Sequence, residues 1–206
     1  MDAKSIILIC VILVIPWMML FMFMFFSNKK VIKNYQKLHQ KYGLKTDFSK
    51  KEGMKIHPTA YGIYRNKDIK IESTVRESLN GKKAAPHTEL LVECLNMDNF
   101  SFTVVKRKKQ NNNVFLDGSS LLDDKDFDNK FIVRTNNPER MKRVFDFNTR
   151  FKLDQVHRLG FEGAIILNGN ALEYIEKNLL DDEESLMRME LVLHEFCDIA
   201  EVMRYN

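Results

Sequence analysis

The residue types best suited to chemistry stand together in one short stretch, HEFCD, at positions 194–198. His194 and Cys197 are three residues apart and His194 and Asp198 are four apart, so on a helix they would share one face. Imidazole, thiolate and carboxylate groups all bind zinc, but a closed zinc site takes four ligands and the sequence shows no obvious fourth. The stretch also differs from H-E-x-x-H, because position 198 is an aspartate. We therefore expect a packed thiol and a surface histidine here, and no metal site.

The acidic stretch DDKDFDN places Asp124, Asp126 and Asp128 at alternate positions. This spacing is typical of the start of an EF-hand calcium loop. Such a loop also needs a glycine at its sixth position and a glutamate at its twelfth, where this sequence has Asn129 and Thr135. We expect a solvated turn before a strand, and no calcium site.

The remaining polar motifs do not assemble into a catalytic set. DGSS at 117–120 lacks both the G-x-S-x-G nucleophile elbow and the lysine of a phosphate loop. The other histidines are scattered, with no nucleophile at a recognisable spacing: His39, His57, His87 and His157. The sequence thus indicates no catalytic residue, no metal and no cofactor. A non-enzymatic protein is the favoured interpretation, although an active site assembled from distant residues stays open.

An apolar run from Ile6 to Phe26 precedes all of these motifs and contains 21 residues without a charge. As a helix it would be about 31 Å long, close to the roughly 30 Å hydrocarbon core of a bilayer. A soluble helix would keep a polar face, which this run lacks. The residues after it offer no A-x-A cleavage site. We predict an uncleaved, single-pass transmembrane helix over residues 5–26, preceded by a short tail of residues 1–4.

A lysine cluster follows the apolar run, with five lysines and no acidic residue: Lys29, Lys30, Lys33, Lys37 and Lys41. The positive-inside rule places this end of the helix, and the rest of the chain, in the cytoplasm. The lysines would contact the lipid surface, or they serve only as a topology signal on a solvated helix face. The formal net charge of the chain is +4, but the residues after the cluster are close to neutral. This pattern does not suit a nucleic-acid binder, which spreads basic charge over its folded part.

The lysine cluster also has helical order. Val31, Tyr35, Leu38 and Tyr42 recur at spacings of three and four, so they line one helix face. Gly43 fits the position after a helix C-terminus. We expect the membrane helix to continue as a basic amphipathic stalk over residues 27–43, whose apolar stripe could pair with another helix.

Residues 44–206 have the pattern of one soluble α+β domain. AYGIYRNKDIKIEST predicts a hairpin, with Tyr61 and Ile63 alternating on one strand and Ile69 and Ile71 on the other. Further strands are expected in TELLVECLN, NFSFTVVKRK and KFIVRT. Together these strands predict an antiparallel β meander packed by helices.

From Pro138 onward the pattern becomes helical. Pro138 suits a first helical position, and a short helix would bury Met141, Val144 and Phe145. A second helical stretch near 148–159 carries Phe151, Leu153, Val156 and Leu159. GAIILNGNALEYI then predicts two short strands around an Asn168-Gly169 turn. The final helix, expected over 183–203, has an apolar stripe that should pack on the sheet: Leu186, Met189, Leu193, Phe196, Ala200 and Met203.

The chain has three cysteines, Cys10, Cys94 and Cys197, and Cys10 lies inside the apolar run. A Cys94–Cys197 bridge is possible, but an odd number without a regular spacing favours free thiols in a reducing compartment.

The segment DKDFDNKFIVRTNNPERMKRVFD, followed by GAIILNGNALEYI, resembles part of a group of uncharacterised bacterial single-pass membrane proteins, over about residues 124–175. The resemblance consists of core and turn residues: Phe127, Asp128, Phe131, Val133, Asn137, Pro138, Gly163, Ile165, Leu167, Asn168 and Leu172. In that group a Phe-Asp or Phe-Asn pair opens a strand, and two helices and a hairpin follow. The threonine-proline expected at the start of the second helix is replaced here by FNTRF. The resemblance implies membrane attachment and a shared fold, and no activity.

These observations favour a membrane-anchored, non-enzymatic module that binds or scaffolds a protein partner at the membrane surface. The alternative is a tethered domain that binds a lipid or a small ligand, with an apolar pocket between the sheet and the final helix. The basic stretch KRKKQ, at 106–110, would lie at the rim of that pocket, or it is only a charged hairpin tip. A metal enzyme or hydrolase around His194 is a third possibility.

Overall fold

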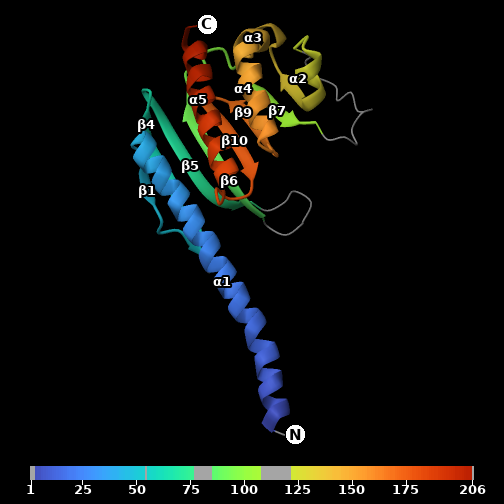
Figure 1. Ribbon diagram of the computed structural model, residues 1–206. Coiled ribbons are helices and arrows are strands. Elements are labelled where there is room, and N and C mark those ends of the chain that lie inside the picture. Colours follow the sequence, from blue (N-terminus) through green and yellow to red (C-terminus); the bar gives the residue numbers. More distant parts are fainter. Residues whose placement is uncertain (1–2, 54, 77–84, 108–121, 206) are drawn as a thin grey trace.

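The computed structural model describes residues 3–53, 55–76, 85–107 and 122–205, which form an antiparallel β-sheet covered by helices (Figure 1). The helices are α1 Ala3–Tyr42, α2 Lys125–Lys130, α3 Pro138–Val144, α4 Phe147–Arg158 and α5 Glu183–Tyr205. The strands are β1 Lys45–Asp47, β2 Lys51–Glu52, β3 Lys55–Ile56, β4 Thr59–Tyr64, β5 Lys67–Arg76, β6 Ala85–Glu93, β7 Phe102–Lys106, β8 Phe131–Thr135, β9 Gly163–Asn168 and β10 Ala171–Lys177. The α+β prediction is confirmed.

The main sheet has eight strands in the order β1-β4-β5-β6-β10-β9-β7-β8, and β2 and β3 form a separate pair. The predicted meander is therefore only partly correct, because the β9–β10 hairpin lies between β6 and β7. The segment that connects β6 to β7 crosses the tip of this hairpin. There the Asn96 side-chain amide donates to the Gly169 carbonyl at 2.7 Å, and the Asn96 N–H donates to Asn170 Oδ1 at 3.2 Å.

One face of the sheet is covered by helices, and the other is at least partly exposed to solvent. One cross-strand row is buried from β4 to β8: Ala60, Ile71, Leu90, Tyr174, Ile165, Val104 and Val133. The helices pack on this face, with α5 lying across β6 and β10. The neighbouring row points the other way and is exposed or half-buried: Tyr61, Lys70, Leu91, Glu173, Ile166, Thr103 and Arg134. We call this second surface the outward sheet face.

Helix α1 runs without interruption from the apolar run into the domain and extends well beyond the sheet (Figure 1). The stripe of Val31, Tyr35, Leu38 and Tyr42 is buried in the same core as the sheet. Gly43 ends the helix as predicted, with a φ of +70° and its N–H bonded to the His39 carbonyl at 2.9 Å. Over the part of the chain that the structure describes, a search of the helices finds none that is long and apolar enough to cross a membrane.

The predicted β4–β5 hairpin forms, with Arg65 and Asn66 at its turn, but Tyr61 and Ile63 lie on the outward face. Ala60 and Gly62 instead occupy the inward positions of β4. This register pairs Ala60 with Ile71 and Gly62 with Ile69 on the inward face. A Cβ at Gly62 would be in ordinary contact with a methyl group of Leu44, at 3.4 Å, and its φ of +153° favours glycine.

Two local predictions near the acidic stretch and α4 need correction. The stretch expected to be a turn forms helix α2, and Phe127 faces inward to stack on Phe131 at 4.6 Å between ring centroids. The Phe127-Asp128 pair therefore lies in a helix and does not open a strand. In α4, Leu153 and Val156 are buried as predicted, but Phe151 points to solvent.

The C-terminal predictions hold with small shifts. The turn between β9 and β10 is Gly169-Asn170, one residue later than expected, because Asn168 pairs with Ala171. Helix α5 begins at Glu183 as predicted, and its whole apolar stripe is buried. The thiols of Cys94 and Cys197 are free and buried.

Candidate functional site

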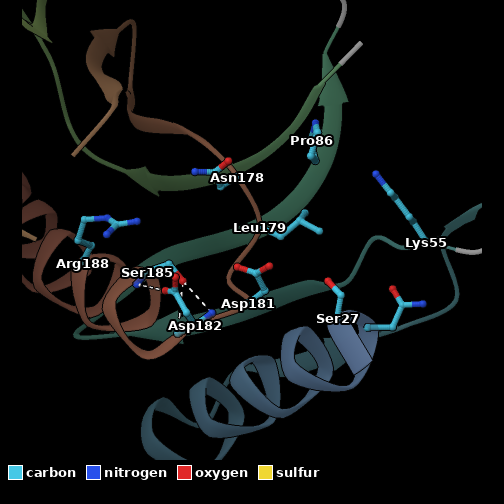
Figure 2. A pocket seen from close by; sticks show the side chains of 10 residues that line it. Ser27, Lys55, Pro86, Asn178, Leu179, Asp181, Asp182, Ser185 and Arg188 are labelled. Atoms are coloured by element: carbon cyan, nitrogen blue, oxygen red, sulfur yellow. Dashed lines mark hydrogen bonds between the residues drawn. The ribbon is translucent and has the colours of Figure 1, made fainter. Parts of the chain in front are cut away.

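A pocket of about 400 Å³ lies where the apolar part of α1 ends and the domain begins (Figure 2). Its lining combines four segments that are far apart in the sequence: Ser27 and Asn28 of α1, Lys55 of β3, Pro86 of β6, and Asn178, Leu179, Asp181, Asp182, Ser185 and Arg188 around the start of α5. The volume falls within the range typical of small-molecule sites. We call it the α1–α5 pocket.

Hydrogen bonds connect the elements that form the walls of the α1–α5 pocket. The Asn34 amide of α1 donates to the carbonyls of Leu180 and Asp182, each at 3.0 Å. Six residues earlier on α1, Asn28 Oδ1 accepts the Ile56 N–H at 3.3 Å. Helix α1 is thus tied both to the segment that leads into α5 and to β3.

The start of α5 positions two carboxylates in different ways. Asp182 caps the helix, since its Oδ1 accepts the Ser185 N–H at 2.7 Å. Hydrogen bonding by the Ser185 hydroxyl, and after it by the Ser185 N–H, lowers the pKa of Asp182. Asp181 lines the pocket without a hydrogen bond or ion pair to any residue that the structure describes, and the same is true of the Lys55 ammonium on the β3 wall. Two opposite charges therefore face the pocket unpaired.

Arg188 lines the pocket, but its guanidinium forms an ion pair inside the domain. Its guanidinium binds the buried Glu176 carboxylate at 2.5 Å and also donates to the Leu159 carbonyl. The Tyr174 hydroxyl donates to the same carboxylate at 2.8 Å. Burial raises the pKa of Glu176, and the hydrogen bond from Arg188 opposes that shift. Arg188 therefore acts as a structural member of the wall.

The five lysines predicted to contact the membrane surface divide into two sets. Lys29, Lys30 and Lys33 are exposed on α1 near the end of the apolar run. Lys37 and Lys41 instead pair with acidic residues of α5, at 3.8 Å to Glu183 and 2.7 Å to Glu190. The hydrogen bond from Lys41 to Glu190 raises the pKa of Lys41. Contact of any of the five with lipid stays a prediction.

The HEFCD stretch lies on α5, where His194 contacts the end of α1. The Tyr42 hydroxyl lies 3.3 Å from His194 Nε2, and the Tyr64 hydroxyl lies 3.3 Å from His194 Nδ1. Burial, with Lys41 and Arg65 nearby, lowers the pKa of His194. The histidine is therefore a half-buried part of the junction between α1, β4 and α5, and this role is not visible in the spacing of HEFCD.

The other two members of the stretch also have structural roles. Cys197 is buried, and burial raises the pKa of its thiol to about 11, as expected for an inert packed cysteine. Asp198 accepts hydrogen bonds from Arg65 at 2.6 Å and from Lys152 at 2.7 Å. Among the described residues, no group of histidine, cysteine and acidic side chains has an arrangement that could hold a metal ion.

The acidic stretch before β8 builds the start of α2. Asp124 Oδ1 accepts the Phe127 N–H at 3.1 Å, and Asp123 pairs with Lys142 at 2.7 Å. Of the basic stretch after β7, Arg107 donates to the Asp128 carbonyl at 2.9 Å, while residues 108–110 and DGSS lie outside the described residues.

The ligand pocket expected from the sequence differs in place and character from the one observed. The space between the sheet and α5 is filled by buried side chains, such as Leu90, Tyr174 and Phe196. The α1–α5 pocket is lined mostly by polar residues instead, and Lys106 is not among them. The only sequence signals near it are the end of the apolar run at Phe26 and the acidic residues before the final helix, and neither predicts that these segments meet.

Comparison with known proteins gives one informative similarity. A scan against protein-family models finds no match, and a search of the curated proteins finds none either. Among solved structures, the fold is similar to the crystal structure of the mycobacterial trehalose monomycolate transport factor A, TtfA, with a TM-score of 0.51 and 11% sequence identity. The match covers 84% of this chain and 93% of that chain. At this identity the likeness concerns the fold alone.

Proposed function

We propose that this chain is a single-pass, membrane-anchored, non-enzymatic module that binds or scaffolds a protein partner at the cytoplasmic surface of the cell membrane. The observation that carries the proposal is that α1 joins the apolar run and the domain core in one helix. A domain whose core includes the end of its anchor keeps a constant orientation to the bilayer. Such an orientation suits a partner that is itself located at the membrane.

The surroundings of the apolar run support the anchor. Its described side chains are exposed, with Trp17 at 72% and Met19 at 67% of their full accessible area. Large apolar side chains that the domain leaves uncovered favour a nonpolar environment. The lysines that follow support the cytoplasmic orientation.

The outward sheet face supports the binding role. Tyr61 and Ile63 at its β4 end are exposed apolar side chains, and the rows beside them mix apolar and charged groups. The residues that suggested chemistry in the sequence, His194, Cys197 and Asp198, have structural partners instead. Binding is therefore favoured over catalysis.

Photo-crosslinking in cells tests this function on matched aromatic positions. Tyr61 on the outward face and Phe151 on α4 are each replaced by p-benzoylphenylalanine in the full chain at its native expression level. We expect a discrete protein adduct from position 61 and not from position 151, and we expect it to disappear when residues 1–26 are deleted. No discrete adduct from either position, or an adduct that persists without the anchor, would overturn the proposal.

The α1–α5 pocket favours a second candidate function, the binding of a lipid or small ligand by the tethered domain. The pocket has a suitable volume and lies beside the end of the apolar run. The structurally similar protein is named for the transport of trehalose monomycolate, and this name is compatible with a lipid-related role. The two functions can coexist, because the outward face and the pocket are built from different side chains.

A further inference from the structure

We infer that the α1–α5 pocket binds a group that carries both a phosphate and a primary ammonium, as in the head group of phosphatidylethanolamine. The inference rests on the proposed membrane anchor for its lipid source, but its chemistry rests on the pocket alone. It goes beyond the second candidate function because it names the ligand class and the residues that select it.

The first step is the charge of the walls. Lys55 on β3 and Asp181 before α5 are unpaired within the described residues and come from different sides of the pocket (Figure 2). Lys55 is exposed and Asp181 is half-buried, so both can reach a ligand. An ammonium donor on one side and a carboxylate acceptor on the other match a ligand with the opposite pair of charges.

The second step excludes purely anionic head groups and choline head groups. The guanidinium of Arg188 is neutralised by Glu176, so the pocket keeps one free cation, Lys55, among its described lining residues. Asp181 and Asp182 also line the pocket. A purely anionic head group could pair with Lys55 but would leave Asp181 without a partner, and an unpaired charge is costly in a partly desolvated site. A choline head group carries no N–H and so cannot donate a hydrogen bond to Asp181. A primary ammonium can.

The third step is location. Ser27 and Asn28 follow Phe26 directly, within about 3 Å along a helix axis. With the apolar run in the hydrocarbon core, the pocket would lie at the level of the lipid head groups, which occupy several ångströms on each side of that core. The Ser27 hydroxyl adds a neutral hydrogen-bonding group at this level. The ligand nearest to the pocket would then be a lipid of the same leaflet.

The test uses the full chain in nanodiscs that contain phosphatidylethanolamine, phosphatidylglycerol or phosphatidylcholine, with bound lipid counted by native mass spectrometry. We expect one retained phosphatidylethanolamine and no selective retention of the other two. Asp181→Asn and Lys55→Gln should each weaken retention about tenfold, as expected for loss of one charge-assisted hydrogen bond. The matched controls Asp68→Asn and Lys177→Gln change exposed charges of β5 and β10 outside the pocket and should change nothing.

Two further measurements separate the outcomes. Equal retention of all three lipids, or retention that neither pocket variant weakens, would overturn the inference. Direct binding of soluble glycerophosphoethanolamine, without retained lipid, would support the pocket chemistry and overturn the lipid source. Alkaline carbonate extraction of the same protein tests the anchor separately, so failure of the proposed function is distinguishable from failure of the pocket. Unchanged thermal unfolding of the variants shows that each one folds.

Discussion

The two halves of α1 share one continuous helix but differ in what surrounds their side chains. In the first half, apolar residues such as Trp17 and Met19 are exposed outside the domain. In the second half, residues of similar character, such as Tyr35 and Leu38, are fully buried in the core. Helical backbone geometry alone therefore does not decide where an apolar stripe is buried. The difference arises from the lysines of the second half, which occupy the other faces of the helix and leave only one apolar face free to pack.

The contacts of the second half explain why the helix and the domain form one body. Asn34 donates two hydrogen bonds to the segment before α5, and Lys41 pairs with Glu190 at 2.7 Å. The Lys41 side of the ion pair is exposed, so the pair contributes little to stability, whereas the buried stripe contributes most. The attachment of α1 to the domain is therefore mainly hydrophobic, and the side-chain amide of Asn34 adds two specific hydrogen bonds.

The largest expected effect comes from the buried half. Tyr35→Ala would leave a cavity in the core and lower the free energy of unfolding by about 3–5 kcal/mol. Tyr35→Phe is the matched variant, because the Tyr35 hydroxyl is buried without a hydrogen-bond partner in the described structure. Removing an unsatisfied buried hydroxyl should leave stability unchanged or raise it by about 1 kcal/mol. Denaturant unfolding of the full chain in detergent measures both. A Phe variant as unstable as the Ala variant would show that the hydroxyl has an essential partner.

The next effect concerns the exposed half. Ile15→Arg places a charge in the middle of the apolar run, which costs about 2.5–3.5 kcal/mol at the centre of a membrane helix. We expect the protein to move from the carbonate-resistant membrane fraction to the supernatant. Gln36→Arg introduces the same side chain at an exposed position of the second half and should leave the membrane fraction unchanged. If both variants stayed in the membrane equally, the two halves would not differ in their surroundings as proposed.

Local sequence patterns predicted the elements whose form depends on near neighbours. The stripe of α5, the end of α1 at Gly43 and the β4–β5 hairpin all follow from spacing and turn chemistry, and the structure confirms them. The strand order did not follow, because it depends on pairing between strands that are far apart in the sequence, such as β6 with β10. The outward position of Tyr61 likewise depends on cross-strand register, in which Tyr61 pairs with Lys70 and Ala60 pairs with the buried Ile71.

The α1–α5 pocket was not predictable for a related reason. Ser27, Lys55 and Asp181 have no mutual spacing that a motif could describe, and each alone is an ordinary polar residue. They come together where Asn34 ties the segment before α5 to α1 and Asn28 ties β3 to the same helix. For HEFCD the packed thiol of Cys197 was predicted correctly, but the expected surface histidine, His194, is half-buried against Tyr42 of α1. A spacing pattern on one helix shows which residues share a face, but it does not show what that face meets.

The smallest expected effect is a pH dependence at the junction of the two parts. Burial, Lys41 and Arg65 lower the pKa of His194, against the opposing influence of Asp198 and Glu190. The unfolded chain therefore binds a proton at this residue more readily than the folded chain. The contribution of His194 to stability is fully present above the ordinary histidine pKa of about 6.5 and declines as the pH falls below that value. His194→Gln should flatten this part of the profile of unfolding free energy between pH 7.5 and 5.

Hydrogen exchange at the end of α1 distinguishes this local effect from a general one. Because the Tyr42 hydroxyl lies 3.3 Å from His194 Nε2, protonation should weaken the packing of the last turn of α1 first. Amides of residues 36–42 should therefore exchange faster at pH 5.5 than at pH 7.5, after correction for the intrinsic rates, in the native chain and not in His194→Gln. His157 is the control, since burial also lowers its pKa but it contacts Phe131, away from α1. His157→Gln should alter the stability profile and leave the pH response of the last turn intact. A response that His157→Gln abolishes and His194→Gln preserves would place the sensitive contact outside the junction.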